Sequence, residues 1–568
     1  MRRGLRMTIF WLACLAILAL PGSAAAAIEV ESFSFGSSSA QAGAHPDVIV
    51  DVSFAEPGEP ETAQDAVVQL PRGLFLYPWT LPRCVTGQLA ADNCPIGSQV
   101  GVVHVHANLD GDPNSALETA PVYLLIPNAD ELIRLAFQPL GFAAPVEVPV
   151  RARAADGYSL SLAFEELPEA MPISSLELAL WGVPPASSHD DERGPAPPVP
   201  GGRPSGIPET PFTRHPTACG TTTATLTAHS YEDPDSFVTA LASGPAISGC
   251  HKLPFGPVAI VTLSSKEAAS ATGVGMEYHL PQNLAPNGLA TSDTEAIALY
   301  LPPGLAVNEV AASQQAACTL AQANLATDDP AACPPASKIG TFGGSLAGTS
   351  DLLEGSVYFG GLEGPGEYLL FLVAIGAGIE LKLPAWLGVG SEAELVIPEL
   401  PQLPLEELDL QTDPAASLFA TPPRCGTFEV GTEAIDWSQP DVASILPSSF
   451  TIDSGPGGGT CPEPQAGQNP PPTSTPPAAT SPATPKPTVK LLEHPPHRGR
   501  DRTPTFRFAS SVAGSTFQCK LDHRSWRLCR SPLTLRKLGL GNHALRIKAS
   551  AAGEASAIVT YRFILAQA

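Results

Sequence analysis

The chain contains an internal duplication whose two copies are punctuated by cysteines at matching places. The matching blocks, first copy against second, are LPRGL (70–74) and LPPGL (301–305), NCPIGSQVG (93–101) and ACPPASKIG (332–340), PVYLLIP (121–127) and SVYFGGL (356–362), MPISSLEL (171–178) and LPLEELDL (403–410), and PTACG (216–220) and PPRCG (422–426). A chain built from two such copies folds most simply as two tandem domains of one architecture. We call residues 28–250 the first repeat and residues 251–462 the second.

Both repeats show the period-2 alternation of β-strands, with Gly and Pro between short apolar segments. The strands predicted in this way are Val48–Phe54, Val100–Leu109, Val146–Ala152, Tyr158–Phe164, Leu176–Trp181, Ala296–Leu301, Ser356–Phe359, Glu380–Leu383 and Glu392–Ile397. A short helix is expected after Thr319, which can cap it. With 62 prolines and 50 glycines the chain has little room for long helices. The pattern is the signature of an all-β sandwich or barrel, and we expect two tandem, β-sandwich-like domains.

The cysteine count predicts disulfides. Eleven cysteines are present, and ten remain once Cys14 is assigned to a leader. Each repeat carries one near pair and one more distant pair, and the C-terminal region carries one further pair, so we expect Cys84–Cys94, Cys219–Cys250, Cys318–Cys333, Cys425–Cys461 and Cys519–Cys529. Closing loops of this size stabilises the fold by about 2.5–4 kcal/mol each in the chain-entropy model. No C-x-x-C pair occurs, which disfavours zinc and dithiol chemistry.

Residues 1–27 have the organisation of a secretory signal peptide. Three arginines precede the apolar segment Met7–Leu20, and small residues follow, so cleavage is expected after Ala25, Ala26 or Ala27. The alternative is a lipoprotein leader ending at Cys14. We expect no transmembrane segment after cleavage, because no second apolar stretch reaches the length of a membrane span. An exported chain with an even cysteine count is expected to be oxidised.

Composition divides the remaining chain. Residues 186–211 form a Pro/Gly-rich insertion in the first repeat, and residues 463–487 form a Pro-rich linker of extended character. From Lys486 onward there are 15 Lys and Arg against 4 Asp and Glu, a net charge of +11, so the rest of the chain carries −36. Opposite charges on separate domains can determine which partners they bind. The few aromatic residues disfavour stacking of sugars or bases, and we expect no nucleic-acid binding.

The C-terminal region, residues 488–568, resembles the bacterial Ig-like repeats of actinobacterial surface and secreted proteins. The resemblance rests on TPTFRFASS (503–511), STFQCKLD (515–522), WRLCRSPLTL (526–535) and GNHALRIKAS (541–550). It implies a small Ig-like β-sandwich. The sequence departs from the family pattern at Ile547, where Val is usual, and in the basic turn at residues 523–525.

The duplicated body is similar to a family of large secreted actinobacterial proteins. The segments that carry this similarity are LWGVPPASSHDDERG (180–194), CPPASKIG (333–340), ATPPRCG (420–426) and SGPGGGTCP (454–462). It implies an exported β-rich protein of a Gram-positive, GC-rich bacterium and implies no reaction.

Three constellations could carry chemistry. Residues 187–191 (SSHDD) hold the residue types of a catalytic triad, but a triad needs a scaffold and an oxyanion hole that five consecutive loop residues do not supply. His104 and His106 face one side of a predicted strand and could ligate a metal, but no third ligand is identifiable, and the D-x-D-x-N segment at 110–114 lacks the Gly and Glu of a calcium loop. The carboxylate pairs Glu165-Glu166 and Glu406-Glu407 are interpreted as solvated strand ends rather than glycosidase acids.

The sequence therefore predicts no catalytic, cofactor or metal site. Our leading hypothesis is a non-enzymatic, exported structural or adhesion-type protein of the cell surface or extracellular matrix. The alternatives are a secreted hydrolase with an unfamiliar site and a carbohydrate- or envelope-polymer-binding protein. An anionic envelope polymer or another surface protein is the expected partner, and the sequence leaves the oligomeric state open. The residues expected to bind such a polymer are Arg498, Arg500, Arg502, Arg524, Arg527, Arg530, Arg536 and Lys537.

Overall fold

The structure, a computed structural model, describes most of residues 28–565. The residues outside this description are 1–27, 56–61, 110–111, 140–143, 170–171, 195–201, 365, 390–392, 462–486, 496–497, 513–514, 522–526, 537, 540, 552–553, 556–558 and 566–568. The expected signal peptide and nearly all of the Pro-rich linker thus lie outside the described residues. None of the helices among the described residues is long and apolar enough to cross a membrane.

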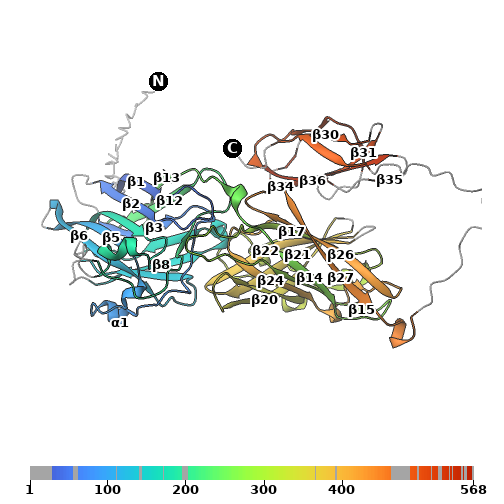
Figure 1. Ribbon diagram of the computed structural model, residues 1–568, viewed down its shortest axis with the longest axis horizontal. Coiled ribbons are helices and arrows are strands. Elements are labelled where there is room, and N and C mark those ends of the chain that lie inside the picture. The colour runs from blue at the N-terminus through green and yellow to red at the C-terminus, as the bar shows by residue number, and fades with distance from the viewer. Residues whose placement is uncertain are drawn as a thin grey trace, which may run out of the picture.

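The first repeat is a single antiparallel sheet of eleven strands (Figure 1). In order across the sheet these are β1 (Glu29–Ser37), β2 (Val48–Ala55), β10 (Ile173–Leu180), β5 (Gln99–Leu109), β6 (Asp112–Leu125), β7 (Ile133–Phe137), β8 (Val146–Ala152), β9 (Leu160–Phe164), β3 (Ala63–Gln69), β12 (Thr223–Ser230) and β13 (Val238–Ser243). The short strands β4 (Phe75–Leu76) and β11 (Thr213–Arg214) pair separately.

The second repeat has the same sheet order. Its eleven strands are β14 (Val258–Leu263), β16 (Val274–His279), β24 (Leu405–Thr412), β19 (Lys338–Leu346), β20 (Leu352–Gly364), β21 (Glu367–Gly376), β22 (Ile379–Gly388), β23 (Glu394–Ile397), β17 (Thr294–Tyr300), β26 (Gly426–Asp436) and β27 (Ala443–Ile452). A small sheet joins β15 (Ala271–Thr272), β25 (Phe419–Ala420) and β18 (Ala306–Val307). The position-by-position match shows that the sequence duplication is a duplication of the whole sheet.

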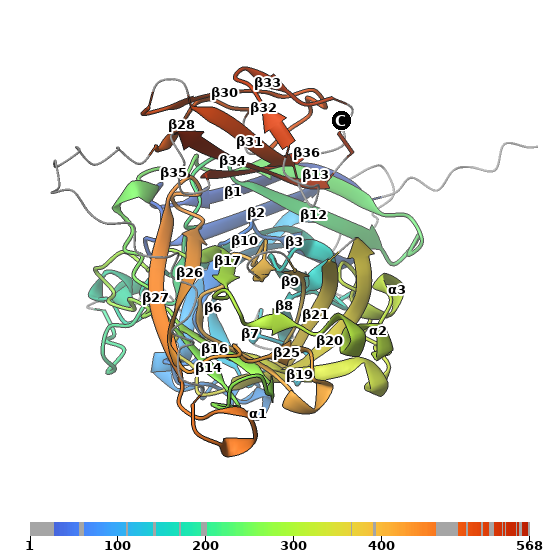
Figure 2. The same ribbon diagram turned by 90° about the vertical axis from the view of Figure 1, so that its right-hand side faces the viewer.

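Each large sheet curls into a near-barrel, so the expected pair of facing sheets in a sandwich is wrong for the repeats (Figure 2). Eleven alternating strands leave the first and last running in the same direction. Their ends meet in parallel bridges, Gln41 with Ser248 and Glu267 with Ser454. Farther along the second seam, the Val261 amide donates to Ser448 Oγ at 3.0 Å. Two parallel edges cannot continue the antiparallel ladder of the rest of the sheet, and these bridges with a side-chain bond join them.

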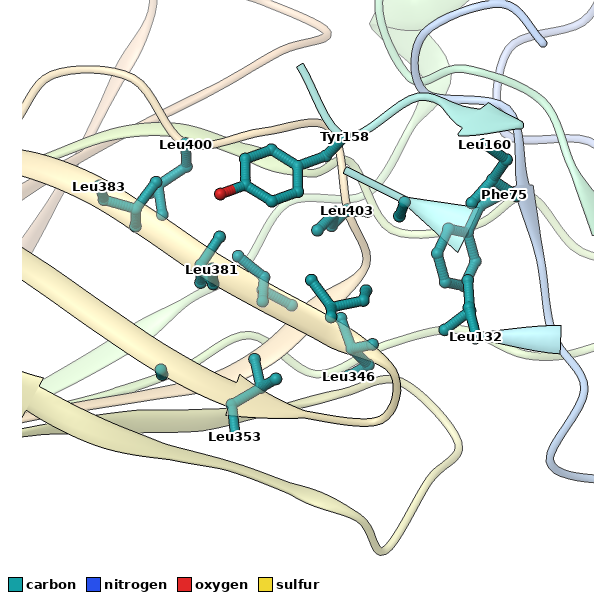
Figure 3. Packing of buried hydrophobic residues seen from close by; sticks show 14 of the residues in the cluster. Phe75, Leu132, Tyr158, Leu160, Leu346, Leu353, Leu381, Leu383, Leu400 and Leu403 are labelled. Atoms are coloured by element: carbon teal, nitrogen blue, oxygen red, sulfur yellow. The ribbon is translucent and has the colours of Figure 1, made fainter. Parts of the chain in front are cut away.

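One hydrophobic core runs through both repeats. Apolar residues of the two near-barrels belong to a single buried cluster, and Figure 3 shows Phe75, Tyr158 and Leu160 of the first repeat beside Leu381 and Leu403 of the second. Tyr158 is held in this position because its hydroxyl donates to the Glu380 carbonyl at 3.2 Å and accepts from the Lys382 amide at 2.8 Å. The repeats are therefore packed together as one body.

The α-helices of the described residues are short and lie at the ends of strands. They are α1 (Thr86–Leu89), α2 (Glu309–Gln314) and α3 (Leu320–Ala323). Thr319 caps α3 as the sequence predicts: its Oγ1 accepts from the Gln322 amide at 3.3 Å, while Gln322 Oε1 accepts from the Thr319 amide at 2.9 Å. This reciprocal pair is a capping box.

The C-terminal domain has its own core, centred on Phe506, Leu545, Ile547 and Phe563. One sheet joins β28 (Val489–Glu493), β30 (Thr505–Ser510) and β33 (Leu533–Thr534). The other joins β29 (Arg498–Gly499), β36 (Val559–Leu565), β34 (Gly541–Ala551), β31 (Thr516–Leu521) and β32 (Arg527–Cys529), with β35 (Glu554–Ala555) on β34. In both views this domain lies along the β17 and β26 side of the second repeat (Figures 1 and 2).

The ten cysteines form five disulfides, in the pairs expected from their spacing. They are Cys84–Cys94, Cys219–Cys250, Cys318–Cys333, Cys425–Cys461 and Cys519–Cys529. Each bond joins residues of one repeat or of the C-terminal domain, so the repeats are held together by packing and ion pairing.

Candidate functional site

A groove of about 750 Å³ crosses the outer face of the second repeat, and we call it the acidic groove. Cross-strand pairing places one row of side chains along it: Ile260 (β14) opposite Glu277 (β16), then Asp409 (β24), Gly343 (β19), and Glu354 (β20). Gly343 adds no side chain to this row. Ile260 and Leu352, which are 54% and 55% exposed, also line the groove.

The charges in this row are unfavourable for folding. Glu277 and Asp409 are directly opposite on neighbouring strands, and like charges in that position destabilise a sheet. Partial burial, together with Glu407 and Glu277, raises the pKa of Asp409. His279 Nδ1, 3.9 Å from Glu407 Oε1, is the nearby basic group. An arrangement that costs stability while facing solvent is suited to a cationic ligand, which would offset the repulsion.

In the first repeat, every position of the corresponding row carries a side chain. Its register equivalents are Asp51, Glu177, His104 and Thr119, so His104 stands where the second repeat has Gly343. His104 Nδ1 lies 2.7 Å from Thr119 Oγ1. Among the described residues no group of three or more His, Cys, Asp and Glu side chains is arranged to hold a metal. Residues 110–111 of the calcium-like segment lie outside the described part of the chain, and Asp112 begins β6.

The SSHDD segment lies in a short 3-10 helix, Ser187–Glu192, in which the serine side chains and the histidine side chain do not share one environment. Ser187 and Ser188 are exposed, whereas His189 is buried and stacks on the Trp181 ring with centroids 4.6 Å apart. Burial lowers the pKa of His189, with Asp47 Oδ1 3.6 Å from its Nε2 opposing the shift. The hydroxyls and the imidazole therefore do not form a nucleophile–base pair.

Arg193 fixes this insertion to the first repeat. Its side chain is fully buried over the Trp181 ring, 5.2 Å from the centroid. Its Nε donates to the Arg203 carbonyl at 2.9 Å, and its Nη2 donates to the Pro184 carbonyl at 2.9 Å. A buried guanidinium needs such acceptors. The described part of the insertion is thus anchored to the first repeat by a buried side chain.

A second groove, of about 850 Å³, lies on the first repeat, and we call it the His229 groove. It is lined by Asp65, Arg134, Glu147, Glu165, Glu166, His229 and Phe237, with prolines and Thr227 between them. His229 Nε2 is 3.0 Å from Asp65 Oδ2, and its Nδ1 is 3.4 Å from the Ser230 carbonyl. Because both ring nitrogens have partners, this histidine is held as a structural group rather than positioned as a base for a nucleophile.

The carboxylate pairs considered from sequence are in different places. Glu165 lies in the His229 groove, where its Oε1 accepts from Arg151 Nη1 at 3.0 Å, and its neighbour Glu166 is exposed. Glu407 lines the acidic groove, whereas Glu406 is half-buried and is not part of its lining. Neither pair forms two facing carboxylates across one cleft.

The eight basic residues expected to bind a polymer are spread over the C-terminal domain. Arg498 (β29) and Arg527 (β32) are on opposite edge strands of the larger sheet. Arg500, Arg502, Arg527, Arg530 and Arg536 are exposed, and Arg502 Nε donates to the Leu538 carbonyl at 2.6 Å. Arg524 and Lys537 lie outside the described residues. The sheet order therefore divides this set between separate edges.

Comparison with known proteins does not assign the chain to a family. No protein-family model matches the sequence, and no curated protein matches it. Solved structures similar to the chain include a biofilm associated protein BSP domain (8% identity, 97% of this chain and 84% of that chain, TM-score 0.15) and the Enterococcus faecalis MSCRAMM ACE (8%, 74% and 95%, TM-score 0.15). The N-terminal region of an enterococcal surface protein aligns at 6% identity over 75% of this chain and 94% of that chain, with a TM-score of 0.16. At such TM-scores these likenesses carry no argument.

Proposed function

We propose that the chain is an exported, non-enzymatic protein of the adhesion type, which holds a cationic, extended partner at the cell surface through the acidic groove. The observation that carries this proposal is the row Glu277, Asp409 and Glu354 between exposed aliphatic side chains. Five disulfides and one continuous core support a rigid extracellular role. An oxidising compartment suits such a protein.

The chemistry of the groove favours an extended peptide in which every second residue is basic or aliphatic. An extended chain presents successive side chains on opposite faces, so alternate residues of one partner strand can face the sheet together. Lys or Arg side chains would pair with the carboxylates, and the exposed surfaces of Ile260 and Leu352 would pack on aliphatic groups. Surface pairing of this kind is sensitive to salt.

Isothermal calorimetry with a peptide of repeated Lys-Ser-Val-Ser, whose Lys and Val side chains lie on one face when it is extended, tests the proposal. We expect Asp409→Asn in the mature chain to weaken binding by on the order of tenfold, about 1.4 kcal/mol. Glu177→Gln is the matched control, because Glu177 occupies the same register position in the first repeat, where His104 fills the row. The proposal fails if the peptide does not bind, or if Glu177→Gln weakens binding as much as Asp409→Asn.

A second candidate function is binding of an anionic envelope polymer by the C-terminal domain. The exposed Arg500, Arg527, Arg530 and Arg536 and the net charge of +11 support it. We expect the full mature chain to be retained on purified cell wall at low salt and to elute as salt rises. Changing Arg527 and Arg530 to Ser should reduce retention. Equal retention of that variant would exclude this surface.

A further inference from the structure

The C-terminal domain covers one face of the second repeat through its basic sheet surface. Strand pairing and alternation put Lys520, Arg546, Lys548 and Arg562 on the same side of the β36–β34–β31 sheet. Arg546 Nη2 donates to Glu394 Oε1 at 2.9 Å, and the two side chains are only 13% and 21% exposed. The Glu394 carboxylate belongs to β23, next to β17.

The covered face also holds a tyrosine–glutamate pair. Tyr300 (β17) donates its hydroxyl to Glu433 Oε2 (β26) at 2.7 Å. Burial, reinforced by Glu433 and Glu394, raises the pKa of Tyr300, and the positive charge of Arg562 opposes the rise. The contact is thus a basic sheet lying on an acidic sheet face, with half-buried ion pairing between them.

The duplication gives this covered face a counterpart on the first repeat. The registers of β3 with β9 and β12 superimpose on those of β17 with β23 and β26, so Gln69, Ser161 and Thr227 correspond to Tyr300, Glu394 and Glu433. The His229 groove lies on this counterpart face, and Thr227 is part of its lining. The same sheet geometry is therefore covered in one repeat and open in the other.

The open face has the charge that a basic domain requires. Asp65, Glu147, Glu165 and Glu166 line it, against Arg134, which is paired with Glu131 and Glu147, and the adjacent Arg151, which is paired with Glu165. Phe237 stands at its edge, 62% exposed, with its ring against His229 at 4.9 Å between centroids. An aromatic anchor beside acidic groups is typical of a protein-binding surface.

We propose that the His229 groove is a docking site for the C-terminal domain of a second copy of this chain. The domain then has two sites at corresponding places in the two sheets, one on its own second repeat and one on the first repeat of a neighbour, and different residues supply the carboxylates in each. The intermolecular contact joins different surfaces of the two copies, so it is head-to-tail and builds rings where the rotation closes and open chains where it does not. The intramolecular site has the advantage of a high effective concentration, and self-association grows when that site is vacated or when copies are crowded.

Analytical ultracentrifugation of the full mature chain at low salt tests this inference. Glu394→Arg breaks the intramolecular contact, and we expect it to raise the association constant by on the order of tenfold. Adding Glu165→Lys and Glu166→Lys to that variant should return it to the monomer. Adding Glu354→Lys instead, which reverses a charge in the acidic groove, should leave the association unchanged. Glu394→Ala also removes the ion pair with Arg546 and is the second opening variant. It replaces Glu394→Arg if the melting temperature of Glu394→Arg shows that this variant does not fold.

The outcomes are distinct from those of the proposed function, because neither Glu394 nor Glu165 lines the acidic groove. The docking proposal is overturned if both opening variants stay monomeric at all concentrations. It is equally overturned if the opened chain associates despite the two lysines in the His229 groove. Increased retention of the opened chain on an anionic resin without self-association would assign the basic face to a polyanion instead.

Discussion

Arg214 of the first repeat and Asp293 of the second form a fully buried, bidentate ion pair. Nη1 and Nη2 each donate to one carboxylate oxygen at 2.7 Å, and neither side chain is exposed. Thr217 Oγ1 also donates to Asp293 Oδ2 at 3.3 Å. Burial raises the pKa of Asp293 and the guanidinium opposes this rise. We assign both groups their charged forms, because two short bonds from an arginine require an acceptor on each oxygen.

Breaking this pair should destabilise both repeats together. We expect Arg214→Met to lower the free energy of unfolding by about 3–5 kcal/mol, because it leaves Asp293 buried without a counter-charge. The double variant Arg214→Met/Asp293→Leu should recover most of that loss. Urea unfolding followed by tryptophan fluorescence measures both. Arg153→Ala, which removes the exposed pair with Asp328, is the control and should cost at most about 1 kcal/mol.

Removing a charge from the acidic groove should stabilise the protein. Asp409 has a raised pKa and faces Glu277, so Asp409→Asn relieves a repulsion at neutral pH. We expect a gain of about 0.2–1 kcal/mol in the free energy of unfolding. Differential scanning calorimetry at pH 7 would show it as a higher melting temperature. A loss of stability would mean that the Asp409 carboxylate is a structural acceptor, and the functional interpretation of the groove would fall.

Mild acid should weaken the first repeat. Burial lowers the pKa of His45, His189 and His215 from 6.5, so the folded protein binds fewer protons than the unfolded chain. The stability they contribute is complete above the unfolded-state pKa near 6.5 and is lost as pH falls below it. We expect the urea midpoint to decrease steadily from pH 7.5 to pH 5.5. The variant His215→Gln should have a flatter pH profile, and an unchanged profile would show that the pKa of His215 is the same in the folded and unfolded states.

The disulfide pairs can be read directly by non-reducing peptide mapping of the purified protein. We expect five linked peptides, each within one repeat or the C-terminal domain. Any peptide that links the two repeats by a disulfide would contradict an interface held by packing, by the Tyr158 hydrogen bonds and by the ion pairs Arg214–Asp293 and Arg153–Asp328.

Much of the local structure could be predicted from the sequence. Val146–Ala152 is β8 at both ends, and the Thr319 cap begins α3. Alternation reports which face of a strand is buried, so the strands and the all-β class follow from it. Tyr158 differs: it was placed in a strand, but it has a positive φ of 63° and reaches into the other repeat, because its hydroxyl finds partners there.

The closure of the sheets and the sites could not be predicted in the same way. Periodicity does not say that β3 lies between β9 and β12, and that long-range order decides between sandwich and near-barrel. The row Glu277, Asp409 and Glu354 spans positions up to 132 residues apart and appears only once the registers are known. Nothing in the sequence indicates that Arg214 and Arg193 are buried, because arginines in proteins are usually exposed.

The disulfide Cys425–Cys461 has a mechanical consequence. Cys425 directly precedes β26, and Cys461 follows β27, so the bond joins the two ends of the β26–β27 hairpin. Tension applied from the C-terminal side reaches Cys461 and crosses the sulfur bridge to Cys425 without passing through the hairpin. Cys219–Cys250 shunts force around β12 and β13 in the same manner. The seam strand of each near-barrel is thereby shielded from peeling when the chain is pulled.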